Sequence, residues 1–528
     1  CLAAIILKLL AKAPEERYQS TWGLIADLKQ CQRQLHEGGT AGSFRLGTED
    51  HAHQFRPPQG RYGRDSDVAL LTETYVRAVA DRGQLLLIRG PAGIGKSSLV
   101  NELYRVTAAS RGRVAIGKCD QFLNSEPFDA VHQALRHLVR RTLEEGEAET
   151  AHMRERLQEV LGGNTAVLAE AVPETRVLVG EQPPPAPLPA SESRNRLTLV
   201  LTRTLQAFAT PERPLVLFLD DLQWTDSATL LLLQALARDP STRHLLLVGA
   251  YRDTEVSTTH PLALALDELR ATGTSWAQLH LVPLGLEEVA RMVHEAIAAD
   301  AGRELELARF ILSRTGGNPF SVKAFLRFLH GQGLLRFDLR NHQWEWELAR
   351  LESQVLPDDI VTLMEADSRR LPPETRALLQ RAACLGVTFG FRDLTVAHGA
   401  TAGETARALW TAIELRLVLP LDRDYVLLDP QGGTAEPTDL DVPFRFVHDR
   451  VRQVAYSLIP EDERATKHLE IGLRLYEDAR ATKTLDERVF SILPHLGHAP
   501  ERIGSDALRL ELADLHLAAG RRAKSSGA

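Results

Sequence analysis

The stretch LLLIRGPAGIGKSSLVNEL, residues 85–103, decides the fold because it joins an apolar run to a helix-like pattern through a glycine-rich loop. Residues 90–97 fit the spacing G-x-x-x-x-G-K-S completely. Glycines let such a loop curl so that successive backbone N–H groups point inward, and the following helix adds the positive end of its dipole. The stretch therefore predicts a phosphate-binding loop between a strand and a helix.

The phosphate loop predicts a nucleotide site with separate roles for its residues. Lys96 supplies a point charge for the β and γ phosphates, and Ser97 offers a hydroxyl to Mg²⁺. A glycine-rich turn that merely packs a helix on a sheet is the structural alternative. The nucleotide-binding residues expected here are Gly90, Pro91, Ala92, Gly93, Ile94, Gly95, Lys96, Ser97 and Ser98.

A second apolar run, PLVLFLDD at residues 214–221, ends in two acids. We expect Asp220 to hold the metal and Asp221 to orient or deprotonate the attacking water. Asp226, five residues later, either caps the next helix or takes part in function. A further run, HLLLVGAYR at 244–252, ends in Arg252, which either senses the γ phosphate or forms a surface salt bridge.

The pattern of the whole chain predicts the fold class. The runs QLLLIRG, RVAIGKC, PLVLFLDD and HLLLVGAYR alternate with helical patterns, which indicates an α/β fold with a parallel sheet and helices on both faces. Residues 283–330 are mostly helical. Residues 357–456 mix helices with an expected strand pair, LVLPLD and YVLLDP, and helices follow Pro460. The strand-like stretch WEWELARLE at 344–352 is expected to pack against the 357–460 region.

The composition of the chain limits which partners and which cellular compartment we expect for it. The 528 residues carry a net charge of −8, which gives no general attraction to nucleic acid or to an anionic membrane. No apolar run approaches the roughly 20 residues of a membrane helix. The four cysteines have no metal-ligand or redox spacing and predict no disulfide framework. We therefore expect a cytoplasmic protein without a membrane partner.

Six segments taken together resemble the signalling ATPases of the AAA+/STAND class. These are YGRDSDVALL, GPAGIGKSS, LVLFLDDLQWTD, LLLVGAYRDTEV, TGGNPFSVKAFLRFL and FRFVHDRVRQVAYSLIP, within about residues 60–460. The likeness is to the ATPase domain of bacterial multidomain proteins that follows a serine/threonine kinase domain and often precedes histidine-kinase modules. The resemblance implies a P-loop NTPase fold, ATP rather than GTP, and Mg²⁺.

The resemblance also implies further site residues. Tyr62, Gly63 and Arg64 correspond to the segment that runs under the adenine. Pro319, in the sequence Gly-Asn-Pro, corresponds to a lid motif that closes on the nucleotide, although a plain helix start would look the same. His448 and Asp449 recur in the family pattern, but we interpret them as a structural helix start. The remaining positional candidates, for an arginine finger that acts between subunits, are Arg194 and Arg196.

One residue departs from standard AAA+ enzymes, in which the second acid is usually Glu rather than Asp221. The shorter side chain favours slow hydrolysis that times a switch over fast turnover. The segment LLAKAPEERYQS resembles the end of a protein kinase lobe, with Arg17 as its structural arginine. Because the kinase motifs are absent from this sequence, we expect no kinase activity in this fragment.

The expected domain order follows from these patterns. It is the end of a protein kinase domain (1–35), a linker (36–58), the ATPase core (59–282), a helical lid (283–356), a winged-helix-like domain (357–460) and a helical segment that resembles the start of a tetratricopeptide array (461–528).

Three functions remain open from the sequence. The first is a slowly hydrolysing ATP switch in a signalling protein, whose partners are other domains of the same longer chain and a homo-oligomer. The second is a nucleotide-held scaffold that does not hydrolyse ATP. The third is a STAND-type transcription regulator, which charge disfavours because residues 357–460 carry 15 acidic residues against 11 arginines and no lysine.

Overall fold

The computed structural model divides the chain into two units. Unit 1 comprises Cys1–Arg64 and Pro283–Asp367, and unit 2 comprises Asp65–Val282 and Ser368–Ala528. The chain therefore crosses between the units three times. The residues that the structure describes are 2–11, 17, 18, 20–38, 44, 46, 47, 55, 57, 58, 60–80, 82–119, 127–186, 188–274, 276–297, 301–338, 343–353, 371–415, 417–429 and 442–526.

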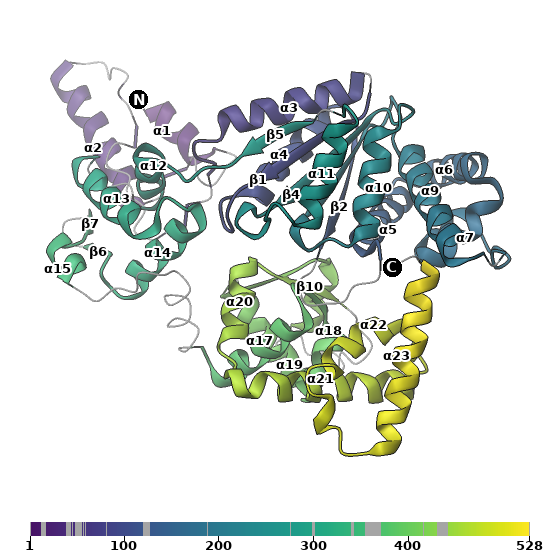
Figure 1. Ribbon diagram of the computed structural model, residues 1–528. Helices are drawn as coiled ribbons and strands as arrows, with labels where there is room; N and C mark the ends of the chain where they lie inside the picture. Colours follow the sequence, from purple (N-terminus) through teal and green to yellow (C-terminus); the bar gives the residue numbers. More distant parts are fainter. Residues whose placement is uncertain are drawn as a thin grey trace. The chain divides into compact units, whose positions relative to one another are not determined.

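A parallel sheet forms the centre of unit 2 (Figure 1). Its described strands lie in the order β2-β3-β4-β1-β5. The strands at the four predicted runs confirm the sequence analysis, and the short strand β5 extends the sheet beside β1. Because all neighbours are parallel, the carboxyl ends of the strands meet along one edge. The strands are β1 (Gln84–Arg89), β2 (Arg113–Lys118), β3 (Leu215–Asp220), β4 (Leu245–Tyr251) and β5 (Ala277–His280).

Helices cover both faces of this sheet, as the continuous apolar strands predict. On β1, Leu86 and Ile88 pack with helices α3 and α4, whereas Leu85 and Leu87 belong to the core formed with α5, α9 and α10. The α/β fold expected from the sequence, a parallel sheet with helices on both faces, is thus confirmed. The helices of this part are α3 (Asp65–Ala80), α4 (Lys96–Ala109), α5 (Asp129–Glu144), α6 (Glu147–Leu161), α7 (Thr165–Ala171), α8 (Arg176–Val179), α9 (Ala190–Phe208), α10 (Ser227–Arg238) and α11 (Pro261–Ala271).

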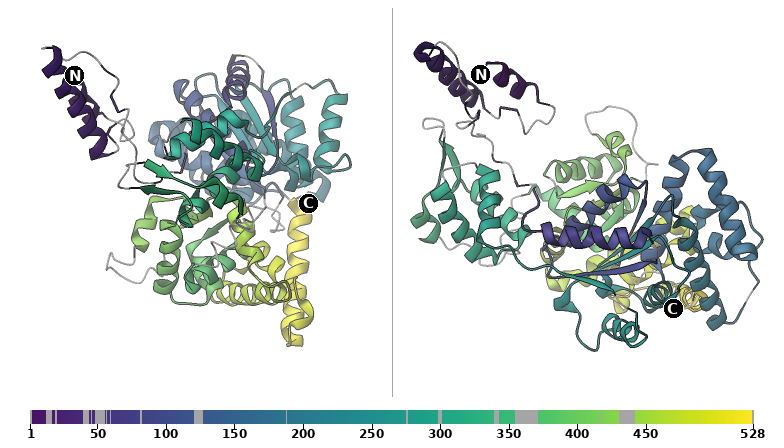
Figure 2. Two further views of the ribbon diagram at one scale, coloured as in Figure 1. Left: turned by 90° about the vertical axis from the view of Figure 1, so that its left-hand side faces the viewer. Right: turned by 90° about the horizontal axis from the view of Figure 1, so that it is seen from above.

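The C-terminal part of unit 2 contains a small antiparallel sheet among helices. Its described strands are β8 (Thr388–Gly390), β9 (Val418–Pro420) and β10 (Pro443–Phe446), with β10 in the middle. Helices then continue to the end of the described chain, and the last of them is yellow in Figure 2. The helices are α17 (Pro373–Leu385), α18 (Phe391–His398), α19 (Ala402–Glu414), α20 (Asp449–Ser457), α21 (Glu461–Thr482), α22 (Leu485–Leu496) and α23 (Asp506–Ser526).

Unit 1 is mostly helical where it is described. Its 283–367 part has a core in which α12, α13 and α14 pack together with Tyr62, so the predicted helical character of residues 283–330 is confirmed. Asn318 begins α14 by accepting hydrogen bonds from the N–H groups of Phe320 and Ser321. The elements are α1 (Leu2–Leu9), α2 (Thr21–Gly38), α12 (Leu286–Ile297), α13 (Ala301–Thr315), α14 (Pro319–Gly331), β6 (Arg336–Asp338), β7 (Gln343–Glu345) and α15 (Leu348–Ser353).

Two expectations from apolar runs were wrong. Residues 423–428 form a 3₁₀ helix that includes the first four residues of the expected strand YVLLDP, and β9 pairs with β10 instead. The stretch WEWELARLE contributes Trp344, Trp346 and Leu351 to the core of unit 1 rather than to the 357–460 region. Short apolar runs are ambiguous because burial, not period, decides their partner.

Cysteine pairing and membrane-spanning character were also open to test. Cys119 and Cys384 are buried and free, in line with the sequence analysis, but Cys31 is disulfide-bonded, which that analysis did not expect. Within the described ranges, no helix has both the length and the apolar character that crossing a bilayer requires.

Candidate nucleotide site

The phosphate loop lies between β1 and α4, and its glycines adopt backbone angles that other residues avoid. Gly90, Gly93 and Gly95 have φ values of +151°, +80° and +104°. A Cβ atom on Gly90 would also lie 2.8 Å from the carbonyl oxygen of Leu281. Glycine is therefore required at Gly90 for both conformation and space.

Lys96 and Ser97 start helix α4 directly after this loop. The Lys96 Nζ donates hydrogen bonds to the carbonyl oxygens of Gly90 and Pro91, at 2.7 and 3.1 Å. Burial lowers the pKa of Lys96, although the nearby carboxylates Asp220 and Asp221 oppose this shift. The loop thus holds a buried amino group at a helix N-terminus, a combination suited to a phosphate chain.

The two residues predicted to hold Mg²⁺ meet in the structure. Ser97 Oγ donates a hydrogen bond of 2.9 Å to Asp220 Oδ2 at the end of β3. Burial and the adjacent Asp221 raise the pKa of Asp220, whereas Lys118 lowers it. A hydroxyl and one carboxylate fit a magnesium ion that takes its other ligands from phosphates and water. No group of three His, Cys, Asp or Glu side chains in the described part of the chain could hold a metal by itself.

Asp221 follows the strand in a left-handed conformation, with φ of +55°. This conformation is uncommon for a residue other than glycine, and such residues often lie at functional sites. Its carboxylate is buried and has partners on both oxygens. Gln223 Nε2 donates to Oδ1 at 2.9 Å, and Lys118 Nζ lies 3.2 Å from Oδ2.

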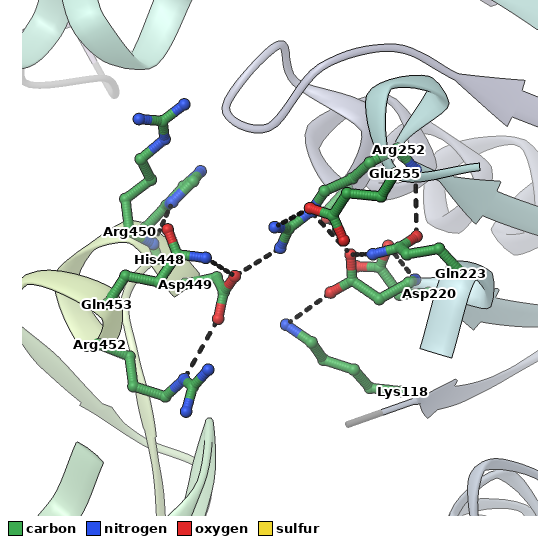
Figure 3. A network of polar contacts seen from close by, with 12 residues as sticks. Lys118, Asp220, Gln223, Arg252, Glu255, His448, Asp449, Arg450, Arg452 and Gln453 are labelled. Atoms are coloured by element: carbon green, nitrogen blue, oxygen red, sulfur yellow. Dashed lines mark hydrogen bonds and ion pairs between the residues drawn. The ribbon is translucent and has the colours of Figure 1, made fainter. Parts of the chain in front are cut away.

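Arg252 lies in a buried network of carboxylates, as Figure 3 shows. Its Nε is 3.4 Å from Asp221 Oδ1, its Nη1 donates to Glu255 at 2.9 Å, and its Nη2 donates to Asp449 Oδ2. The guanidinium also lies over the ring of Trp224, 4.5 Å from its centroid. Burial alone would lower the pKa of Arg252, but Asp221 and Asp449 outweigh it and raise the pKa.

Lys118 is a second cation in this network that the sequence analysis did not identify. Burial acts to lower its pKa, but Asp221, Asp220 and Asp449 outweigh this effect and raise it. Nothing in the sequence indicated this role, because Lys118 lies far from both motifs along the chain. Only the pairing of β2 with β3 brings it beside Asp220 and Asp221.

His448 and Asp449 begin helix α20, and their roles differ. His448 Nδ1 accepts a hydrogen bond from the N–H of Arg450, so its interpretation as a helix start is confirmed. Burial lowers the pKa of His448 to about 4. Asp449, in contrast, joins Arg252 to Arg452. Burial would raise the pKa of Asp449, but Lys118, Arg252 and Arg452 outweigh it and lower the pKa.

Asp226 is a helix cap. Its carboxylate accepts hydrogen bonds from the N–H and the hydroxyl of Thr229 at the start of α10, and from the N–H of Phe128. The structural alternative of the sequence analysis is therefore confirmed for this residue. Of the candidate finger arginines, Arg196 donates to the carbonyl oxygen of Ala186, and both Arg194 and Arg196 stay predictions.

The residues expected near the base belong to unit 1. Tyr62 donates its hydroxyl to Glu295, and burial together with this carboxylate raises the pKa of Tyr62. Gly63 has φ of +61°, and Arg64 is buried. Pro319 stands at the first turn of α14, so the helix-start interpretation of this motif is confirmed. The ligand roles of these residues stay predictions.

Comparison with known proteins agrees with this geometry. Residues 61–248 match the AAA ATPase domain. The chain is 25% identical to "Hybrid signal transduction histidine kinase G" from Dictyostelium discoideum. This alignment covers 100% of the chain and 18% of that protein. It is also 19% identical to "Peroxide stress-activated histidine kinase mak3" from Schizosaccharomyces pombe, in an alignment that covers 73% of the chain and 20% of that protein. The chain thus spans about a fifth of the length of these curated relatives.

A solved structure is similar at low identity. It is a Signal Transduction ATPase with Numerous Domains (STAND) protein with a tetratricopeptide repeat sensor from Pyrococcus horikoshii, 13% identical, with a TM-score of 0.44. The match covers 88% of this chain and 51% of that one. The bacterial origin implied by the resemblance is not tested by these proteins and stays a prediction.

Proposed function

We propose, from the match of residues 61–248 to the AAA ATPase domain, that the chain binds Mg²⁺-ATP and hydrolyses it slowly as a switch in a signal-transduction protein. The names of the two curated relatives, both signalling histidine kinases, support the signalling context. Other domains of a longer chain are its proposed partners, and the cytoplasm is its proposed compartment.

The site residues divide the proposed work between binding and chemistry. The loop N–H groups and Lys96 bind the phosphates, while Ser97 and Asp220 hold Mg²⁺. The metal supplies charge neutralisation on the phosphates when it is bound. Asp221 orients the attacking water and accepts its proton, and Arg252 stabilises charge on the γ phosphate.

The observation that carries the switch proposal is the ion pair between Arg252 and Asp449. Arg252 follows β4 of the ATPase core, and Asp449 begins α20 in the C-terminal part of unit 2, 197 residues later. Both side chains are buried. Because the same guanidinium is the proposed partner of the γ phosphate, binding of ATP competes with the contact to α20. The nucleotide state then biases the arrangement of the C-terminal part.

The test is steady-state ATP hydrolysis with Mg²⁺, in which the native chain is compared with Asp221→Asn. We expect a slow but measurable native rate, and a variant that still binds ATP but does not turn it over. Asp226→Asn is a matched control, since Asp226 caps α10 and its substitution should leave the rate unchanged. A native protein that binds ATP and shows no turnover would refute the hydrolysing switch.

A nucleotide-held scaffold without hydrolysis is the second candidate. It is favoured by the engagement of both carboxylate oxygens of Asp221 with Gln223 and Lys118. A hydrolysis rate that disappears in Asp221→Asn excludes it. Transcription regulation is a weaker alternative because the 357–460 region is acidic, and a salt-dependent shift of duplex DNA would revive it.

The domain order proposed for the chain keeps the boundaries of the sequence analysis. The small sheet with α17 to α20 supports a winged-helix-like domain at 357–460, and α21 to α23 support a helical segment that begins a tetratricopeptide-like array. We also propose that residues 1–35 are the end of a kinase domain, without kinase activity. A homo-oligomer in which a neighbouring subunit supplies an arginine finger is the last part of the proposal.

A further inference from the structure

We propose that Arg452 sets how strongly the site prefers ATP over ADP, because it stays with Asp449 when the γ phosphate draws Arg252 away. This inference deepens the proposed function and rests on it, since it needs ATP to compete for Arg252. Arg452 lies on α20, outside the residues that the sequence analysis assigned to the nucleotide. In Figure 3 the carboxylate of Asp449 lies between the guanidinium groups of Arg252 and Arg452.

The three side chains of this arrangement are buried. Those of Arg252, Asp449 and Arg452 are 6%, 8% and 1% exposed. Arg452 Nε donates to Asp449 Oδ1 at 3.3 Å, whereas Arg252 Nη2 donates to Oδ2. The uncharged amide of Gln453 also donates to Oδ2, at 3.2 Å. Because the two arginines contact different oxygens, the departure of Arg252 leaves the contact with Arg452 in place.

Arg452 is fixed to the helix that carries Asp449. It follows Asp449 by three residues on α20, so that the two side chains are neighbours on one helix face. Its Nη1 also donates to the carbonyl oxygen of Ala383, in the last turn of α17, at 3.3 Å. The last carbonyl groups of a helix have no partner within the helix, so an arginine is well placed there. Arg252, in contrast, follows β4 of the ATPase core.

The charge of Asp449 makes the departure of Arg252 costly. Burial alone would raise the pKa of Asp449, but the charges of Lys118, Arg252 and Arg452 outweigh it and lower the pKa. A buried carboxylate that loses a partner is strongly destabilised. Of the two cations that stay, Lys118 has its ammonium 3.2 Å from Asp221, whereas Arg452 contacts Asp449 directly. Arg452 therefore lowers the cost of withdrawing Arg252, which favours ATP and leaves ADP unaffected.

The experiment measures by calorimetry the Kd of a non-hydrolysable ATP analogue and the Kd of ADP, both with Mg²⁺. We expect Arg452→Met to raise the Kd of the analogue by about tenfold to a hundredfold, the usual size for a hydrogen bond to a charged group. The Kd of ADP should stay native. Arg452→Lys keeps a cation on the same turn of α20 and should recover part of the lost affinity.

Arg474→Met is the matched control. Arg474 also donates to a carbonyl oxygen in the last turn of a helix, that of Ala397 in α18, at 3.0 Å. Its replacement removes a comparable contact from the C-terminal helices without touching Asp449. The control variant should therefore bind both nucleotides like the native chain.

A second pair of variants tests whether Arg452 acts through the charge of Asp449. In Asp449→Asn no charge is left to neutralise once Arg252 has moved. Adding Arg452→Met to this variant should therefore leave the ratio of the two Kd values where Asp449→Asn alone puts it. A residue that only supported the packing of α20 on α17 would weaken binding of the analogue in both backgrounds.

The outcomes separate this inference from the proposed function. A native Kd of ADP in Arg452→Met shows that the variant is folded, so a higher Kd of the analogue alone supports the inference. A native Kd of the analogue in Arg452→Met overturns the inference while ATP binding stands. An equal loss of affinity for ADP, or an undiminished effect in the Asp449→Asn background, also overturns it. A native chain that binds no ATP overturns both proposals.

Discussion

The ion pair between Arg252 and Asp449 leads to a prediction about the discrimination between ATP and ADP. If the γ phosphate takes the place of Asp449 on the Arg252 guanidinium, then ATP must break a buried contact that ADP leaves intact. Asp449→Asn keeps an acceptor oxygen at the same place but removes its charge. We therefore expect the variant to bind an ATP analogue more tightly while its affinity for ADP stays the same.

The magnitude follows from the contact that ATP displaces. A hydrogen bond to a charged group contributes about 1.5–3 kcal/mol, and a neutral one contributes about 1 kcal/mol. The substitution therefore makes the free energy of binding of the analogue more favourable by about 0.5–2 kcal/mol, which corresponds to roughly a two- to thirtyfold lower Kd. Asp221 and Glu255 remain as partners of Arg252, so the guanidinium keeps its place in the variant.

Calorimetric titration with a non-hydrolysable ATP analogue and with ADP, both with Mg²⁺, measures the ratio of the two affinities. Asp393→Asn, at a partly exposed pair with Arg488 in the same unit, is the matched control. In an Arg252→Gln background, Asp449→Asn should have no further effect on this ratio. The reasoning is refuted if the ratio is native in Asp449→Asn, or if ADP gains as much affinity as the analogue.

Two further predictions concern stability. Burial lowers the pKa of His468 to about 3 and the pKa of His495 to about 4. On acidification the unfolded chain therefore takes up protons before the folded one does. Each of the two histidines should lower the free energy of unfolding by about 1.4 kcal/mol per pH unit as the pH falls from 6.5 towards 4. Thermal unfolding against pH checks this, and His468→Leu should flatten the dependence; an equally steep variant would contradict the assignment. Gly117→Ala should cost about 3 kcal/mol or more because of the contact with Ala130, whereas Gly163→Ala, with open space around it, should unfold in denaturant like the native chain. Native stability in Gly117→Ala would show that α5 yields easily.

Local sequence was enough to predict the glycine-rich loop between β1 and α4 and the two acids at the end of β3. The phosphate loop and the acids of β3 are contiguous motifs whose residues need no distant partner to be recognised. Strand β5 escaped notice because only two of its four residues, AQLH, are apolar and only Leu279 among them is buried. Its pairing with β1 is a tertiary effect that no local period announces.

The network around Asp221 could not be predicted for a different reason. Lys118, Asp221 and Asp449 come from three distant segments, and each side chain alone looks like an ordinary surface charge. Only the fold makes them partners, by placing the end of β2 beside β3 and the start of α20 beside Arg252. Sequence analysis accordingly assigned Asp449 a structural role, because its candidate partners were not visible.

The phosphate loop also touches the last residues before the chain leaves unit 2. Leu281 donates its N–H to Arg89 at 2.9 Å, and its carbonyl oxygen closes the space above Gly90. Two residues later, Pro283 begins unit 1. A displacement of Pro283 is therefore passed to the phosphate loop through Leu281, which is buried in the same core as Ile94 of that loop. Movement at the start of unit 1 and binding of a nucleotide at the loop would thus act on the same short stretch of backbone.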